Sequence, residues 1–181
     1  FKMKNIKTSI IAILVLTFSY ANAQEKEKKN HDHGDMKMDH SKMAMDVNKE
    51  AVKSVMKSYK DAIQNLTTDG TFELFTPDAT VFEQGKVEGT YVDYINHHLG
   101  PELGHFKSFT FSDYNIDVTV NLPYAYTSES YLYTIVLKGD ESKGKKERTI
   151  ESKGVATSIL KMVNGEFKIV HTHSSFKKLK Q

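Results

Sequence analysis

Four long runs of β-branched and aromatic residues fill the C-terminal part of the chain and most constrain its fold. These strand patterns extend over residues 106–120, 125–137, 149–163 and 166–176. Asn121-Leu122-Pro123 and Asn164-Gly165 are turn sequences, and a polar loop at 139–146 separates the middle two runs. Strands joined by short turns pair antiparallel, so the sequence predicts a sheet of long antiparallel strands.

The segment before these strands has a helical pattern. Apolar residues recur at helical spacing over residues 47–66, and Asp46 is the expected N-cap. A helical turn is predicted at residues 72–75 and a strand at 79–83. Helices followed by a run of strands indicate an α+β fold.

A second helix is predicted just before the first long strand. Thr90 with Asp93 has the pattern of a capping box, which places the start of the helix at Tyr91. Gly100-Pro101 is expected to end it after Leu99, because this pair interrupts helical hydrogen bonding.

The chain resembles the nuclear transport factor 2-like superfamily, in particular its SnoaL-like bacterial members. The resemblance lies in the order of these elements and in two segments, EGTYVDYINHHL and NGEFKIVHTHSS. The resemblance covers residues 47–178. It implies a cone in which a curved antiparallel sheet wraps around N-terminal helices and encloses a pocket, and a homodimer formed through the open sheet face. This fold serves enzymes, binding modules and assembly domains, so the resemblance does not select a function.

The last strand supplies the first candidates for the pocket. Phe167, Ile169, His171, His173 and Ser175 alternate onto one face of a regular strand. Because the first two are apolar, this face is expected to point inward. His171 and His173 are then predicted to point into the cone near its open end.

Other elements add further candidates. In the resembling family the helix containing His97 and His98 covers the cone, and since the two are adjacent only one can point inward. The predicted pocket set is completed by a loop histidine, two carboxylates and a phenol: His97, His98, His105, Glu83, Glu129, Tyr131, His171 and His173.

Three interpretations of this set stay open. The histidines can be structural, with hydrogen bonds inside a polar cavity. His171 and His173 with a helix histidine can form a three-nitrogen site for Zn(II) or Cu(II). Alternatively, a histidine or glutamate can act as acid and base on a small organic molecule, with a tyrosine stabilising an oxyanion.

The N-terminus has the layout of a secretory signal. Lys4 and Lys7 precede an apolar run at residues 10–18, and Ala21-Asn22-Ala23 matches a cleavage site before Gln24. We therefore expect a signal peptide at residues 1–23 and a periplasmic or secreted protein with no membrane segment after cleavage. The alternative is a retained membrane anchor, although the apolar run is short for one.

The charge of the mature protein limits the kinds of partner that it can bind. The chain has 25 basic and 23 acidic residues and no cysteine. Three of the lysines lie in the predicted signal, and without them acidic residues outnumber basic ones. A nucleic-acid partner is therefore not expected.

Residues 24–46 have no apolar periodicity and are expected to be disordered. Within them HDHGDMKMDHSKMAM resembles the Met- and His-rich segments of bacterial periplasmic copper-resistance proteins, and thioether ligands favour copper over zinc. The candidate ligands are His31, His33, Met36, Met38, His40, Met43 and Met45. The alternative is a solvated tether that contains these residue types without binding metal.

The predicted layout is therefore a signal peptide at 1–23, a His/Met-rich segment at 24–46, a domain at 47–178 and a tail at 179–181. The expected function is binding, with copper on the arm and a small ligand or metal in the cone. The alternative is a small-molecule isomerase or lyase.

Overall fold

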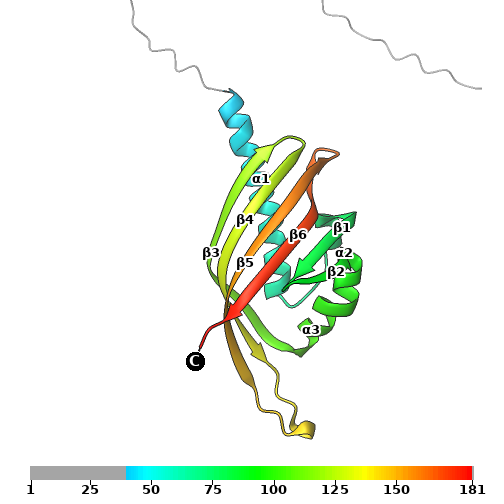
Figure 1. The fold of residues 1–181 in the computed structure, drawn as a ribbon, viewed down its shortest axis with the longest axis vertical. Coiled ribbons are helices and arrows are strands. Elements are labelled where there is room, and N and C mark those ends of the chain that lie inside the picture. The colour runs from blue at the N-terminus through cyan, green and yellow to red at the C-terminus, as the bar shows by residue number, and fades with distance from the viewer. Residues whose placement is uncertain (1–39, 181) are drawn as a thin grey trace, which may run out of the picture. The chain divides into compact units, whose positions relative to one another are not determined.

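The computed structural model describes residues 40–180 of the 181-residue chain. The helix α1 (His40–Gln64) lies along the inner face of a curved six-stranded sheet (Figure 1). The predicted signal at 1–23 and the candidate ligands His31, His33, Met36 and Met38 lie outside the described residues. No helix in the part that is described is long and apolar enough to cross a membrane.

The sheet has the strand order β2-β1-β6-β5-β4-β3. Its strands are β1 (Phe75–Glu83), β2 (Lys86–Thr90), β3 (Phe106–Asn121), β4 (Tyr124–Leu137), β5 (Arg148–Val163) and β6 (Glu166–Lys178). β1 and β6 pair parallel, and the other neighbouring strands in this order pair antiparallel. The four long strands predicted from the sequence are confirmed, and so is the α+β cone fold.

Short helices close one side of the cone. They are η1 (Phe72–Leu74), α2 (Tyr91–Tyr94), the π-helical η2 (Ile95–Leu99) and α3 (Gly100–His105), and η3 (Glu141–Lys143) lies in the β4–β5 hairpin loop. The capping box predicted at Thr90 is present, with hydrogen bonds in both directions to Asp93.

The prediction that Gly100-Pro101 ends the second helix is wrong. The chain passes through the π-helical turn, in which the Gly100 N–H donates to the Ile95 carbonyl, and continues as α3 to His105. A Cβ on Gly100 would lie 2.4 Å from that carbonyl oxygen, so glycine is needed here. Pro101 sits in the first turn of α3, where a missing N–H is tolerated.

The helix α1 begins earlier than the sequence analysis predicts. Asp46 lies inside the helix, so the predicted N-cap is wrong, and residues 40–46 are helical, in contrast to the disorder predicted for them. The segment from Ser41 to Met45 is rich in good helix formers and contains no glycine or proline. Extending an existing helix adds a hydrogen bond for each residue, which favours continuation into this segment.

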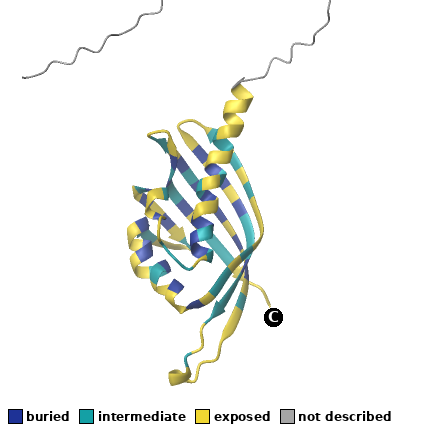
Figure 2. Ribbon diagram, turned by 180° about the vertical axis from the view of Figure 1, so that it is seen from behind, coloured by how far each residue is buried: buried dark blue, intermediate teal, exposed yellow. Residues whose placement is uncertain are grey.

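The core lies between α1 and the sheet. Val52, Met56, Tyr59 and Ile63 form the buried stripe of the helix, which packs against β3 and β6. Each fully buried side chain of this kind contributes roughly 1.5–3 kcal/mol relative to exposure. Figure 2 shows that buried and exposed positions alternate along the strands that α1 covers. This packing places the inner face of the sheet around a cavity.

Candidate functional site

A cavity of about 150 Å³ lies among α1, the inner face of the sheet and the α2–α3 region. Its wall combines apolar side chains, such as Met56 and Phe109, with carboxylates, a lysine and tyrosine hydroxyls. An apolar wall with a few convergent polar groups is the usual composition of a small-molecule site.

A buried ion pair forms one wall. Lys60 Nζ lies 2.8 Å from Glu129 Oε2, and the Glu129 side chain is fully buried. The Tyr114 hydroxyl donates to the same oxygen at 2.8 Å. The other oxygen, Glu129 Oε1, has no hydrogen-bond partner among residues 40–180. One oxygen of this buried carboxylate is therefore left unpaired within the described part of the chain.

Three aromatic rings surround the ammonium group of Lys60. Its Nζ lies 5.1 Å from the ring centre of Phe111, 5.2 Å from that of Tyr114 and 4.6 Å from that of Tyr131. Ring faces attract a cation at these distances. Burial, followed by the negative charge of Glu129, raises the pKa of Tyr114 and Tyr131. Both hydroxyls therefore stay protonated at neutral pH and can act as donors.

A second carboxylate–phenol pair also lines the cavity. The Tyr94 hydroxyl donates to Glu83 Oε2 at 2.7 Å, and both residues line the cavity. Burial is the main cause that raises the pKa of Tyr94. The pKa of Tyr133, another cavity residue, is raised to about 12 for the same reason.

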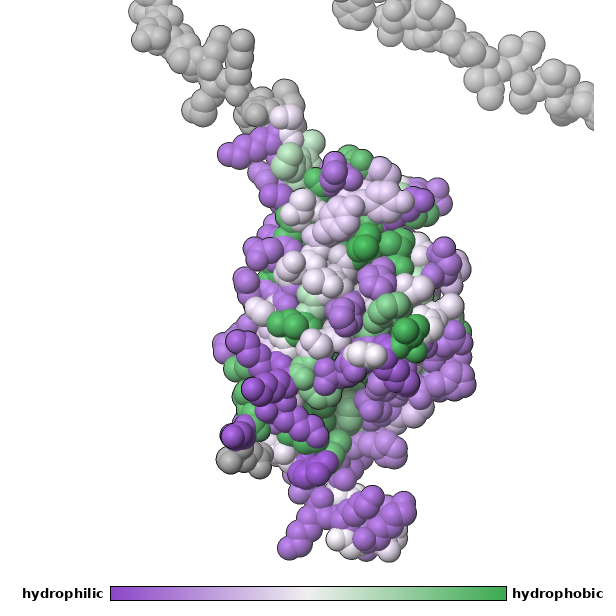
Figure 3. Space-filling model, viewed as in Figure 1, coloured by the Kyte–Doolittle hydropathy of each residue, from purple (hydrophilic) through white to green (hydrophobic). Residues whose placement is uncertain are grey.

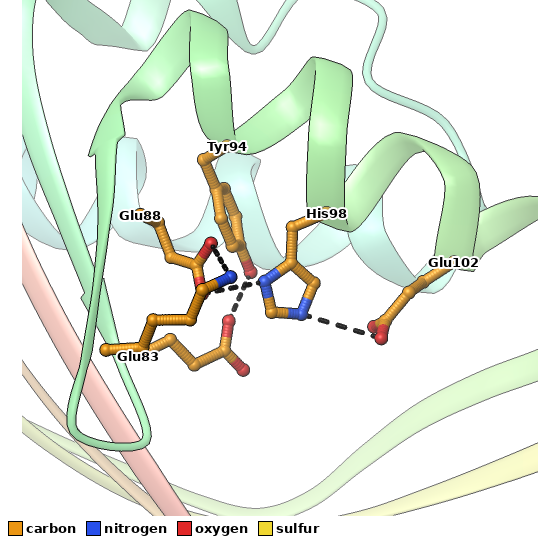
Figure 4. A network of polar contacts seen from close by, with 6 residues as sticks. Glu83, Glu88, Tyr94, His98 and Glu102 are labelled. Carbon is orange, nitrogen blue, oxygen red and sulfur yellow. Dashed lines mark hydrogen bonds and ion pairs between the residues drawn. The ribbon is translucent and has the colours of Figure 1, made fainter.

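A polar network connects the covering helices to β2 (Figure 4). His98 lies between two carboxylates, with Nδ1 3.0 Å from Glu88 Oε1 and Nε2 3.5 Å from Glu102 Oε1. The first contact is not aligned for a hydrogen bond, so it acts as an ion pair when the ring is protonated. Burial raises the pKa of Glu102, which lines the cavity.

Three of the eight predicted pocket residues line the cavity, namely Glu83, Glu129 and Tyr131. The five histidines do not. His98 belongs to the network beside the cavity, and His97 and His105 are exposed on the covering helices.

The predicted inward orientation of His171 and His173 is wrong. Ile159 pairs with His171 while Leu160 pairs with Ile169, so one residue of β6, Val170, has no partner. This bulge reverses the alternation after it, because one added residue moves every later side chain to the opposite face. Thr172 and Ser174 line the cavity instead.

His171 and His173 therefore lie on the outer face of the sheet, away from the cavity. His171 Nδ1 is 2.8 Å from Thr80 Oγ1, and the ring of Phe82 contacts both histidine rings edge-on. Burial and then the charge of His173 lower the pKa of His171. Figure 3 shows the sheet from the side opposite to α1, and apolar and polar groups are mixed there.

The predicted three-nitrogen metal site does not form. Residues 40–180 contain no group of three or more histidine or acidic side chains that could hold a metal ion. Met43 and Met45 are exposed on α1. Two residues apart on a helix, they point about 200° from each other and cannot chelate one ion together.

Four important residues are not among those predicted from the sequence: Lys60, Tyr94, Glu102 and Tyr114. A signal was available for Lys60, because a lysine within the apolar stripe of a helix needs a buried partner. Tyr94 has the i+3 spacing from Tyr91 that marks the inner side of the covering helix. For Tyr114 and Glu102 the pattern contains no comparable signal.

Comparison with solved structures identifies the same fold. A proposed ketosteroid isomerase from Shewanella frigidimarina NCIMB 400 is 24% identical, with a TM-score of 0.58 over 69% of this chain and 94% of that one. A proposed dehydratase of the nuclear transport factor 2-like family from Streptomyces avermitilis is 14% identical, with a TM-score of 0.61 over 72% and 97%. A proposed aromatic ring hydroxylase from Novosphingobium aromaticivorans is 15% identical, with a TM-score of 0.61 over 72% and 92%.

The comparison with curated proteins gives no match. The family model of the SnoaL-like domain matches residues 52–177, which span the buried part of α1, the cavity and all six strands. The chain therefore belongs to the SnoaL-like domain family.

Proposed function

We propose that the cone binds a small organic molecule of about the size of one six-membered ring. The observation that carries this proposal is the cavity of about 150 Å³ with polar groups in an aromatic wall. An apolar cavity of about that volume accommodates benzene. The relatives named as isomerase, dehydratase and hydroxylase support a role for the cavity in small-molecule chemistry.

Filling the cavity tests this proposal. Ala156 is buried on its wall, and Thr157 is the next residue on the outward face of the same strand. In a thermal-shift screen of single-ring compounds, Ala156→Leu should abolish stabilisation by any hit, and Thr157→Leu should keep it. A hit that stabilises both variants equally binds elsewhere and refutes the proposal.

Acid–base catalysis is the second candidate function. The Glu83–Tyr94 hydrogen bond and the raised pKa of Glu102 favour it, because they place a proton acceptor and a proton donor on one wall. Glu83→Gln would then abolish turnover of a bound compound and leave its affinity within a few fold. Turnover that survives in this variant would exclude Glu83 as the base.

We further propose that the mature protein is exported and that its His/Met-rich segment binds copper. This proposal rests on the residue types of the segment and on the signal-like residues 1–23. Deleting residues 31–39 should remove uptake of Cu(I) in competition with a chelator, whereas replacing Met43 and Met45 by leucine should reduce it less. Uptake unchanged by the deletion would contradict the proposal.

A further inference from the structure

The wall of the cavity carries more acidic than basic side chains. Among the described residues that line it, Glu83, Glu102 and Glu129 are acidic, and Lys60 is the basic one. The charge of Lys60 is compensated by Glu129, whose carboxylate lies 2.8 Å from its Nζ. Glu83 and Glu102 remain, so a ligand in the cavity meets an excess of negative charge.

Glu83 and Glu102 belong to the polar network of Figure 4, and neither side chain is fully buried, so a ligand can reach both. Glu83 accepts from the neutral hydroxyl of Tyr94, and Glu102 lies 3.5 Å from the ring of His98. Burial raises the pKa of Glu102, and the negative charge of Glu83 raises it further. The two carboxylates therefore repel each other, and a positive charge placed beside them relieves this repulsion.

Aromatic rings continue the wall beside these carboxylates. Phe109 and Tyr133 are stacked with ring centres 5.3 Å apart, Phe176 meets Tyr133 edge-on at 5.8 Å, and all three line the cavity. Burial raises the pKa of Tyr133, and the negative charges of Glu83 and Glu102 add to this effect, which places both carboxylates near this ring. Ring faces attract cations and form the cages that bind quaternary ammonium ligands in other proteins.

The wall of the cavity already holds one cation of the chain in such surroundings. The ammonium group of Lys60 lies between 4.6 and 5.2 Å from the centres of three aromatic rings and pairs with one carboxylate. Within the described residues, Glu83 and Glu102 form no ion pair with a lysine or an arginine. The rings and carboxylates at that part of the wall therefore have room for a cation from outside the chain.

We propose that the ligand is a small organic cation built on a single ring, of the pyridinium or benzylic ammonium type, which lies against Tyr133 and its neighbouring rings and pairs with Glu83 and Glu102. This inference rests on the proposed binding function of the cone and names the chemical class of its ligand. A neutral ring of equal size gains the same apolar contacts but no attraction to the carboxylates.

Calorimetric titration of the full chain with N-methylpyridinium, toluene and benzoate tests the inference. The first two are single rings of nearly equal size and shape that differ in charge, and benzoate has the opposite charge. N-methylpyridinium should bind at least about tenfold more tightly than toluene, and benzoate more weakly than toluene. If toluene or benzoate binds as tightly as N-methylpyridinium, the cone binds small rings but the assignment to a cation is overturned. If none of the three binds, the proposed function of the cone fails and the inference fails with it.

Variants locate the effect at the two carboxylates. Glu83→Gln/Glu102→Gln removes both charges with little change in size, and it should lose the tenfold preference and keep the affinity for toluene. Each single change should account for a few fold of this loss. Glu73→Gln/Glu141→Gln removes two exposed carboxylates that do not line the cavity, and it should keep the preference. A preference that persists in the first double variant contradicts the inference.

Discussion

At the residue scale, the Lys60–Glu129 pair dominates the interior. Both side chains are nearly or fully buried, and their contact of 2.8 Å is completed by Tyr114. Removing water from two charges is costly, and their attraction compensates only while both remain. The pair therefore adds little to the net stability of the fold, and its main effect is to place two charged groups in the wall of the cavity.

Removing one partner should expose this cost. Lys60→Met is expected to lower the free energy of unfolding by about 3–5 kcal/mol, because it leaves an uncompensated buried carboxylate. Lys60→Met/Glu129→Gln should recover much of the loss. Urea denaturation measures both, with Lys57→Met on the exposed side of α1 as the control. A double variant as unstable as the single one would show that the charge is not responsible.

Glu88 is expected to make stability depend on pH. Burial acts to raise its pKa, but the hydrogen bond from Lys86 and the nearby positive charge of Lys86 and of protonated His98 outweigh burial and lower the pKa below 4.5. A lowered folded-state pKa stabilises the fold above the unfolded value, and this contribution is lost as pH falls through the folded value. Urea midpoints between pH 7 and pH 3 should therefore fall less steeply in Glu88→Gln than in the parent.

The control for that measurement is Glu73→Gln, which changes an exposed glutamate outside the network. Its profile should follow the parent. If Glu88→Gln also follows the parent profile, the network around His98 does not supply the acid-sensitive stability.

At the scale of single elements, β6 shows where periodicity fails. Phe167 and Ile169 point inward as the alternation predicts, and both are buried. The bulge at Val170 then transfers the inward positions to Thr172 and Ser174. A bulge depends on the strand that pairs beside it, so alternation within β6 alone cannot locate it. The helix end predicted after Leu99 is wrong for a similar reason, because the sequence pattern does not reveal the π-helical turn through which the chain continues.

The pairing of β4 with β5 yields another testable expectation. Gly154 lies opposite Tyr131, and a Cβ at Gly154 would approach the tyrosine ring to 2.2 Å. Gly154→Ala should therefore displace the ring toward the cavity, lower the free energy of unfolding by about 1–3 kcal/mol and weaken ligand binding. Denaturation and titration check both effects, with Lys153→Ala at the next, exposed position as the control. Unchanged affinity would show that the ring does not shape the site.

At the scale of the whole molecule, self-association stays a prediction. The outer face of the sheet presents Tyr124, Tyr126 and Val155, which are all exposed. If the predicted homodimer uses this face, Val155→Glu should shift the protein to monomer, because it places a charge in an apolar interface. Analytical ultracentrifugation measures this shift. Val87→Glu, at an exposed position on β2, is the control, and a parent protein that is monomeric at high concentration would refute the prediction.

The kinds and order of the elements could be predicted from the sequence, because helical and strand periodicity are local properties of the chain. Glu83, Glu129 and Tyr131 could also be predicted as residues of the pocket. The tertiary structure alone decided which face of β6 lines the cavity, that Lys60 pairs with Glu129, and that the histidines lie elsewhere. Those features depend on contacts between segments distant in the chain, and no local pattern encodes such contacts.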